Sequence, residues 1–354
     1  MSGKDDFTGW LLFARSHLLS AVTLKSSPKK NSYPLALLND YAMANEMINK
    51  AVLCFCGIQF DETSHKTDIA DKLKKCTGDI LPDELRKELV RLDEIENSFR
   101  WYVGASRFAD SMVPRVRADI TTPSVMGRAH RNVTFTKEFC AKLLAHNGIR
   151  QMPVNLDIPE FGKTGFSPSE RNHDRPEPFR WADDSMEYVL AAEDLLNSNV
   201  AENLDLPILC HCQMAVETMF KGILQLHGFS HLFEHDLTVL LDKIRKTTDA
   251  AIPDEVVSAA DILNGYAYDG KYPGHTPIKS IGTAETIKLV VSVYEFGSEQ
   301  FFIENGEHLP DIRKPVRMPD AVYHICRQKG KKPAKIIRKK RSGGNPSGGP
   351  GDGR

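Results

Sequence analysis

Residues 210–224 read CHCQMAVETMFKGIL, and residues 39–53 read NDYAMANEMINKAVL. The second stretch stands 171 positions before the first. Within it, Glu46 matches Glu217 and Lys50 matches Lys221; outside it, Trp10 matches Trp181 and Gly57 matches Gly228 at the same offset. One offset shared by separated segments indicates two copies of one structural unit.

Residues 210–224 have the apolar spacing of a helix. At 100° per residue, one stripe holds four small or apolar side chains: Cys212, Ala215, Met219 and Ile223. Glu217 and Lys221 lie on the opposite side, but so does Met214. An apolar residue there indicates a second packing surface, through which the two units could pair across a pseudo-twofold axis.

Helical periodicity and proline content divide the chain. We predict an all-α fold of two tandem up-and-down helical bundles, residues 1–147 and 181–305. Residues 148–180 hold five prolines and are interpreted as a linker. A short extension, 306–326, leads to a basic tail, 327–354, which is too poor in apolar residues to fold and is predicted to be disordered.

The composition is that of a soluble protein long enough for two domains. The chain has 354 residues, of which 41% are hydrophobic and 26% charged. No apolar run is long enough to cross a bilayer, and the N-terminus does not resemble a secretory signal. The cysteines number seven and lie mostly in apolar stretches, as in reduced proteins. We therefore predict a cytoplasmic protein without membrane contact.

The net charge of -1 hides an asymmetry, because residues 327–354 carry +9 and residues 1–326 carry -10. Flexible basic segments bind polyanions by counterion release. We predict that the tail contacts nucleic acid through these residues: Lys331, Lys332, Lys335, Arg338, Lys339, Lys340 and Arg341. A contact with the acidic body and a nuclear-import signal are the alternatives.

The second unit resembles the HEPN family. The resemblance rests on residues 210–224, a glycine at Gly228, the His235-Asp236-Leu237 triplet, and the flanking Trp181 and Tyr272-Pro273. It covers residues 181–304 and implies a small helical bundle that is commonly dimeric. The first unit is similar but more diverged, with Lys66-Thr67 in place of the family's Asp-Leu.

The resemblance also implies RNA cleavage, nucleotide binding, or nucleotidyltransferase partners in toxin–antitoxin and defence systems. Nuclease members have an Arg, then four to six other residues, then a His, late in the bundle. Only Arg317 and His324 have this spacing; Pro319 interrupts them, and both lie outside the bundles. An irregular stretch is expected from Met112 to Arg131. Around it, low-ranking catalytic candidates are available: Arg107, Arg117 and His130.

Several polar residues are candidates for ligand binding, and each also has a structural interpretation. Glu46 with Lys50, and Glu217 with Lys221, are i,i+4 pairs that either support a helix surface or line a polar groove for phosphate or base. Three residues stand near helix starts, where they cap the helix or bind a ligand: His65, His235 and Asp236. Tyr272, in an irregular segment, suits a base contact.

Three functions remain open. The first is an RNA- or nucleotide-binding regulatory protein of a stress, defence or toxin–antitoxin system, without a convincing nuclease motif. The second is a metal-independent endoribonuclease with a non-standard active site. The third is a protein-interaction scaffold that uses the far-side methionines. No metal or cofactor is expected, whereas an antitoxin or nucleotidyltransferase-type partner and a homodimer are.

Overall fold

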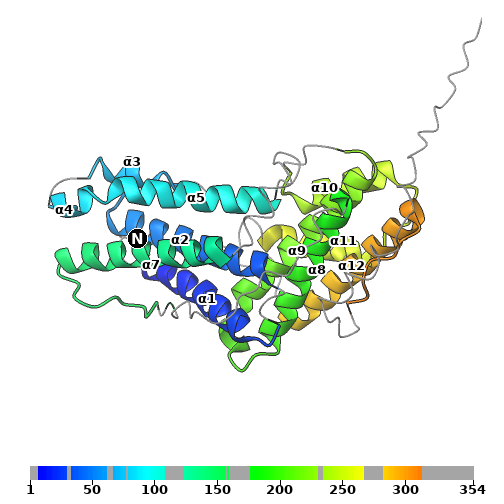
Figure 1. Ribbon diagram of the computed structural model, residues 1–354, viewed down its shortest axis with the longest axis horizontal. Coiled ribbons are helices and arrows are strands. Elements are labelled where there is room, and N and C mark those ends of the chain that lie inside the picture. Colours follow the sequence, from blue (N-terminus) through cyan, green and yellow to red (C-terminus); the bar gives the residue numbers. More distant parts are fainter. Residues whose placement is uncertain are drawn as a thin grey trace, which may run out of the picture.

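The structure is a computed structural model that describes residues 7–29, 33–61, 67–76, 79–107, 123–156, 158, 176–229, 234–266 and 282–312. Every regular element in these ranges is a helix and none is a strand, which confirms the all-α prediction (Figure 1). None of the helices described is both long and apolar enough to span a membrane.

The first half is built around one central helix. Its helices are α1 (Phe7–Ser26), α2 (Pro34–Phe55), α3 (Ile69–Leu73), α4 (Asp83–Arg86), α5 (Leu89–Arg107) and α7 (Pro123–His146). The central helix α2 packs against α1, α5 and α7. Because α7 begins at Pro123, the expectation of irregular backbone up to Arg131 is wrong there. Proline has the φ angle of a first helical turn, and no second proline follows before His146.

The second half has the same plan. Its elements are α8 (Glu177–Leu196), the short 3-10 helix η3 (Ala201–Asn203), α9 (Asp205–Leu226), α10 (Leu237–Thr247), α11 (Asp254–Gly265) and α12 (Thr283–Asn305). The central helix α9 packs against α8, α10, α11 and α12. Both bounds of α9 stand 171 residues after those of α2.

The two central helices also end in the same way. Gly57 has a φ of 69° and Gly228 a φ of 86°, the left-handed region that favours glycine. Beyond them, the Ile58 N–H donates to the Leu53 carbonyl (2.9 Å) and the Phe229 N–H to the Leu224 carbonyl (3.1 Å). These bonds close each helix in a Schellman-type turn. The recurrence of glycine at this offset therefore has a backbone cause.

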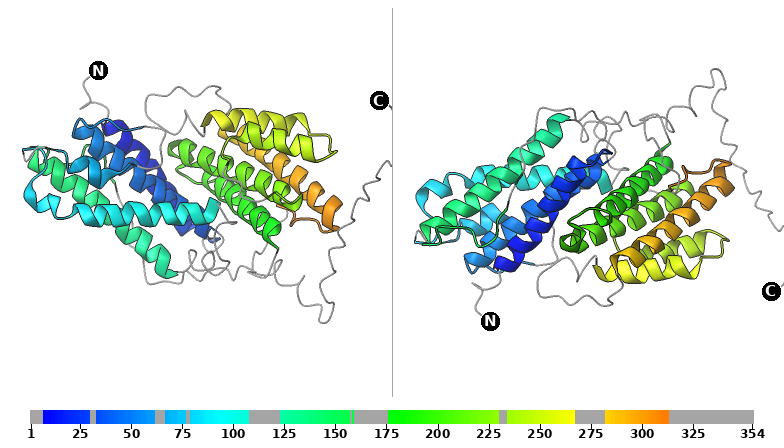
Figure 2. Two further views of the ribbon diagram at one scale, coloured as in Figure 1. Left: turned by 90° about the horizontal axis from the view of Figure 1, so that it is seen from above. Right: turned by 90° about the horizontal axis from the view of Figure 1, so that it is seen from below.

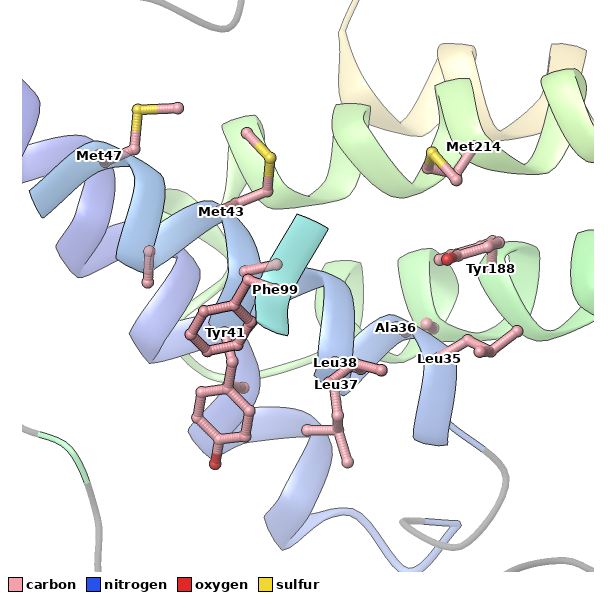
Figure 3. Close-up of a cluster of buried hydrophobic side chains, with 14 of the residues drawn as sticks. Leu35, Ala36, Leu37, Leu38, Tyr41, Met43, Met47, Phe99, Tyr188 and Met214 are labelled. Carbon is pink, nitrogen blue, oxygen red and sulfur yellow. The ribbon is translucent and has the colours of Figure 1, made fainter. Parts of the chain in front are cut away.

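The second packing surface predicted from Met214 is present, and it lies between the halves. Met43 on α2 and Met214 on α9 are both buried. Figure 3 shows them with Tyr188 of α8 in one cluster of buried side chains. Each central helix thus contacts the other half of the chain, α2 through α8 and α9 through α1. Because Met43 and Met214 are buried, they are not available to an outside partner.

The halves meet through their first two helices. α1 and α8 lie side by side at the centre of the molecule (Figure 2), and α1 also contacts α9 while α2 contacts α8. Asp194 of α8 accepts hydrogen bonds from three groups of the α1–α2 connection: Ser27 Oγ (2.7 Å), Lys29 Nζ (2.8 Å) and Tyr33 Oη (2.7 Å). One carboxylate of the second half therefore holds the connection of the first.

Candidate functional site

In the second half, the predicted ligand residues Glu217 and Lys221 form a buried ion pair. Lys221 Nζ donates to Glu217 Oε1 at 2.9 Å, and neither side chain is more than 1% exposed. The ammonium lies 5.7 Å from the centre of the Trp181 ring, within the range of a cation–π contact. Gln213 Nε2 donates to the other carboxylate oxygen at 2.8 Å. Lys221 therefore acts on any ligand only through its neighbours.

His235 connects this buried pair to the surface. Its Nδ1 lies 2.9 Å from Glu217 Oε1, and its side chain is 34% exposed. A carboxylate at that distance favours the tautomer with the proton on Nδ1, which turns Nε2 into an acceptor. A histidine oriented by a carboxylate can accept a proton or, once protonated, donate a hydrogen bond to a phosphate. We name Glu217, Lys221 and His235 the His235 cluster.

Asp236, although next to His235, belongs to a different structure. Its carboxylate accepts hydrogen bonds from the N–H groups of Thr238 (2.9 Å) and Val239 (3.1 Å), and so caps α10. Burial acts to raise the pKa of Asp236, but the hydrogen bonds from Thr238 and Val239 outweigh it and hold the pKa below its usual value. The Leu237 N–H donates to Asn264 Oδ1 of α11 at 3.0 Å.

The first half repeats the buried pair. Lys50 Nζ donates to Glu46 Oε1 at 2.7 Å, is not exposed at all, and lies 5.2 Å from the centre of the Trp10 ring. Neither i,i+4 pair is therefore on a solvated helix surface. The other ligand candidates, His65 and Tyr272, lie outside the described residues.

At the start of α3, where the first half lacks the family's Asp-Leu pair, another residue caps the helix. The Glu96 carboxylate of α5 accepts hydrogen bonds from Thr67 Oγ1 (2.8 Å) and from the N–H groups of Asp68 (3.0 Å) and Ile69 (3.2 Å). Glu96 is 6% exposed. A residue 29 positions after Thr67 thus does for α3 what Asp236 and Asn264 do for α10.

A second polar cluster, which we did not predict from the sequence, lies between the halves. His17 Nδ1 is 3.0 Å from Asp40 Oδ1, and His211 Nε2 is 3.4 Å from Asp40 Oδ2. Ser20 Oγ donates to Asp40 Oδ2 at 2.6 Å, and all four side chains are buried. One signal was available in the sequence, since Asp40 and His211 occupy the same position of the repeat.

In this second cluster, the pKa shifts of His17 and Asp40 each favour the charged form. Burial acts to lower the pKa of His17, but the Asp40 carboxylate and the Cys210 side chain outweigh it and raise the pKa to about 9. Burial acts to raise the pKa of Asp40, whereas His211 and His17 hold it below its usual value. A carboxylate between two imidazoles is thus kept ionised inside the molecule.

The catalytic candidates are not brought together by anything that the structure describes. His130 lies on α7, partly buried, with its ring centre 6.1 Å from that of Tyr41. Arg107 is the last residue of α5, and its side chain lies outside the described part. Arg117, the pair Arg317 and His324, and the tail residues also lie outside it. Within the described ranges, no group of three or more His, Cys, Asp or Glu side chains could hold a metal ion.

Comparison with known proteins bears on the second half. No curated protein and no solved structure matches the chain. The family model of the HEPN domain matches residues 180–301, which run from the start of α8 almost to the end of α12 and include the whole His235 cluster. The chain therefore contains a HEPN domain at residues 180–301.

Proposed function

We propose that the protein is an RNA- or nucleotide-binding regulatory protein of a stress, defence or toxin–antitoxin system, and that the His235 cluster contacts the ligand. HEPN domains are associated with RNA binding, RNA cleavage and such systems. The observation that carries the proposal is the partly exposed imidazole of His235, whose Nδ1 is held by a buried carboxylate.

The charges of the cluster suit an anionic ligand. Lys221 neutralises the Glu217 carboxylate from inside the bundle, so a proton on His235 gives the cluster a net positive charge at its exposed end. A protonated imidazole oriented in this way donates a charge-assisted hydrogen bond to a phosphate oxygen. The ligand would thus contact His235, while Glu217, paired with Lys221, orients the imidazole of His235.

The same contact favours a second function, a metal-independent endoribonuclease with a non-standard active site. A His–Glu pair is the arrangement by which a carboxylate orients a general base. Arg107 or Arg117 with His130 is the other version of this function. By contrast, the scaffold function loses support, because Met43 and Met214 are buried.

The partners and the location follow as further proposals. We propose a cytoplasmic protein whose basic tail adds phosphate contacts and which works with an antitoxin or a nucleotidyltransferase-type protein. A homodimer, if it forms, would use a surface other than the contact between the two halves.

The test is a titration of the full-length protein with end-labelled single-stranded RNA and with a nucleoside triphosphate, with and without a chelator. Both retardation and cleavage are scored for the native chain, H235A and H146A. His146 is an exposed histidine at the end of α7 and serves as the matched control. We expect at least tenfold weaker binding for H235A and native binding for H146A. Equal binding by all three proteins would overturn the assignment of the site.

Cleavage separates the two functions. Binding without cleavage, with or without chelator, supports the regulatory protein. Chelator-resistant cleavage that H235A abolishes supports an endoribonuclease at the His235 cluster. Cleavage that survives in H235A but is abolished in H130A would move the active site to α7.

A further inference from the structure

Asp40 and His211 occupy the same position of the repeat, and they contact each other. Each is the seventh residue of its helix, α2 or α9, and the distance from Asp40 Oδ2 to His211 Nε2 is 3.4 Å. In a twofold interface, equivalent residues meet only where the axis passes. The helix contacts are reciprocal in the same sense, since α1 packs on α9 and α2 on α8. Asp40 and His211 therefore lie beside a local twofold axis between the halves.

Each half surrounds its own axial residue with side chains that fit it. In the first half, Asp40 has His17 at 3.0 Å and the Ser20 hydroxyl at 2.6 Å. In the second half, the position of His17 is taken by Tyr188, whose ring stacks on His211 with 5.8 Å between ring centres. The two halves thus differ together at these positions, one built around a carboxylate and the other around an imidazole.

We infer that Asp40 and His211 make this interface selective for unlike halves. If a second copy of either half docked through the same face, the axis would bring Asp40 against Asp40 or His211 against His211. Two buried carboxylates cannot both stay ionised at such a distance. Two facing imidazoles would have no carboxylate between them. One like pairing thus brings two buried carboxylates together, and the other removes the carboxylate that faces His211 in the native chain. Costs of this kind are how an interface rejects a wrong partner.

The consequence is that one chain supplies both sides of this interface. The face formed by α8 and α9 of the HEPN domain accepts the first half of the chain and rejects a second HEPN domain. The same holds for the face formed by α1 and α2. One chain thus completes this interface by itself, and a site that needs both halves occurs once in each chain.

Four full-length proteins test the inference: the native chain, D40H, H211D and the exchanged chain D40H/H211D. The single variants place two histidines or two aspartates at the axis and so imitate the like pairings inside one chain. We expect each to lower the melting temperature by at least about 5 °C, because a buried charge is left without its partner. The exchanged chain restores an unlike pair, so its melting temperature should fall clearly less than the two single decreases together. Additive decreases would overturn the inference.

A milder set covers the case in which a single variant does not fold. D40N removes the carboxylate and H211N removes the imidazole, and their double variant should again be less destabilised than the sum, since both touch one contact. The oligomeric state of the native protein in light scattering should not depend on His211, so H211D should leave it unchanged. If the native protein forms a dimer that H211D separates into single chains, His211 faces its own copy and the inference is wrong.

Discussion

Glu187 of α8 accepts a hydrogen bond from the backbone N–H of Ala36, at 3.0 Å, and thereby caps the first turn of α2 in the other half. The same oxygen accepts the N–H of Leu35. Neither the first turn of α2 nor its N-cap residue, Tyr33, supplies an acidic side chain or a side-chain cap. A helix of one half thus has its N-terminal cap on the other.

We predict that E187A destabilises the whole protein. The substitution removes an N-terminal cap and leaves two buried N–H groups without an acceptor, so the free energy of unfolding should fall by about 1–2 kcal/mol in urea denaturation. E202A, on the exposed surface of η3, is the control and should change it by less than about 0.5 kcal/mol. Equal effects of the two variants would mean that Glu187 is not a cap in solution.

We predict that loss of a buried ion pair lowers the free energy of unfolding much more than loss of an exposed one. K221M leaves the Glu217 carboxylate buried without its main counter-charge and should lower the free energy of unfolding by about 3 kcal/mol or more. The double variant E217Q/K221M should recover part of this decrease. R245A breaks the exposed pair with Asp242 and should cost at most about 1 kcal/mol. A K221M protein as stable as R245A would show that Lys221 is solvated.

The His17–Asp40 contact predicts a pH dependence of stability. The folded pKa of His17 is raised to about 9, above its usual value of 6.5, so its stabilisation is complete below about 6.5 and disappears as the pH rises through about 9. The pKa of Asp40 is lowered from its usual 3.8, so its stabilisation is complete above about 4 and is lost only as the pH falls through the lowered pKa. From the His17 shift, the free energy of unfolding should fall by about 3 kcal/mol between about pH 6 and 10.

Urea denaturation between about pH 5 and 10 measures this effect. H17Q should be less stable than the native chain at low pH, and its stability should change much less at high pH. H146Q removes an exposed histidine and should keep the native profile. A native stability that stays level across this range would contradict the assignment.

α3 is capped by Glu96 of α5, and α10 by its own N-cap residue, Asp236. We predict that removal of either carboxylate destabilises the protein to a similar extent. E96A on α5 and D236A at the start of α10 should each lower the free energy of unfolding by about 1–2 kcal/mol, because each removes an acceptor shared by several N–H groups. D93A changes an exposed acid of α5 and is the control. A harmless E96A would mean that α3 is capped by another group.

The tail gives a prediction that rests on charge alone. Removal of residues 327–354 changes the net charge from -1 to -10, so RNA affinity should fall. The slope of log affinity against log salt should flatten by about 0.7 for each phosphate of a single strand that the tail neutralises in the native complex. Filter binding at several salt concentrations measures both. Unchanged affinity and slope would assign all phosphate contacts to the helical part.

The repeat was enough to predict the helical fold class and the central helices, because helix ends such as Gly57 and Gly228 depend on local backbone chemistry. It was not enough to predict that Lys50 and Lys221 are buried. Periodicity gives the side of a helix on which a residue lies, but not what covers that side, and here the rings of Trp10 and Trp181, each from the same half, lie near the two ammonium groups.

Long-range partners could not be predicted from the sequence for a similar reason. Glu96 caps a helix that begins 27 residues earlier, and no local pattern connects the two. The contact between Asp40 and His211 joins residues 171 apart, and it becomes visible only when the two halves are placed together. Glu217, Lys221 and His235 could each be named as candidates from the sequence, because all lie within one family motif, but the contact between His235 and Glu217 was not predicted.

The tryptophans beside the two buried ammonium groups give each half its own optical reporter. Trp10 lies in the first half and Trp181 in the second, and the centre of each ring lies within 6 Å of a lysine Nζ. This contact is lost when that half unfolds. With Trp101 changed to phenylalanine, the fluorescence of W10F and W181F chains would follow one half at a time during unfolding. Coincident transitions would mean that neither half persists without the other, and the contact between them would then be part of the folding unit itself.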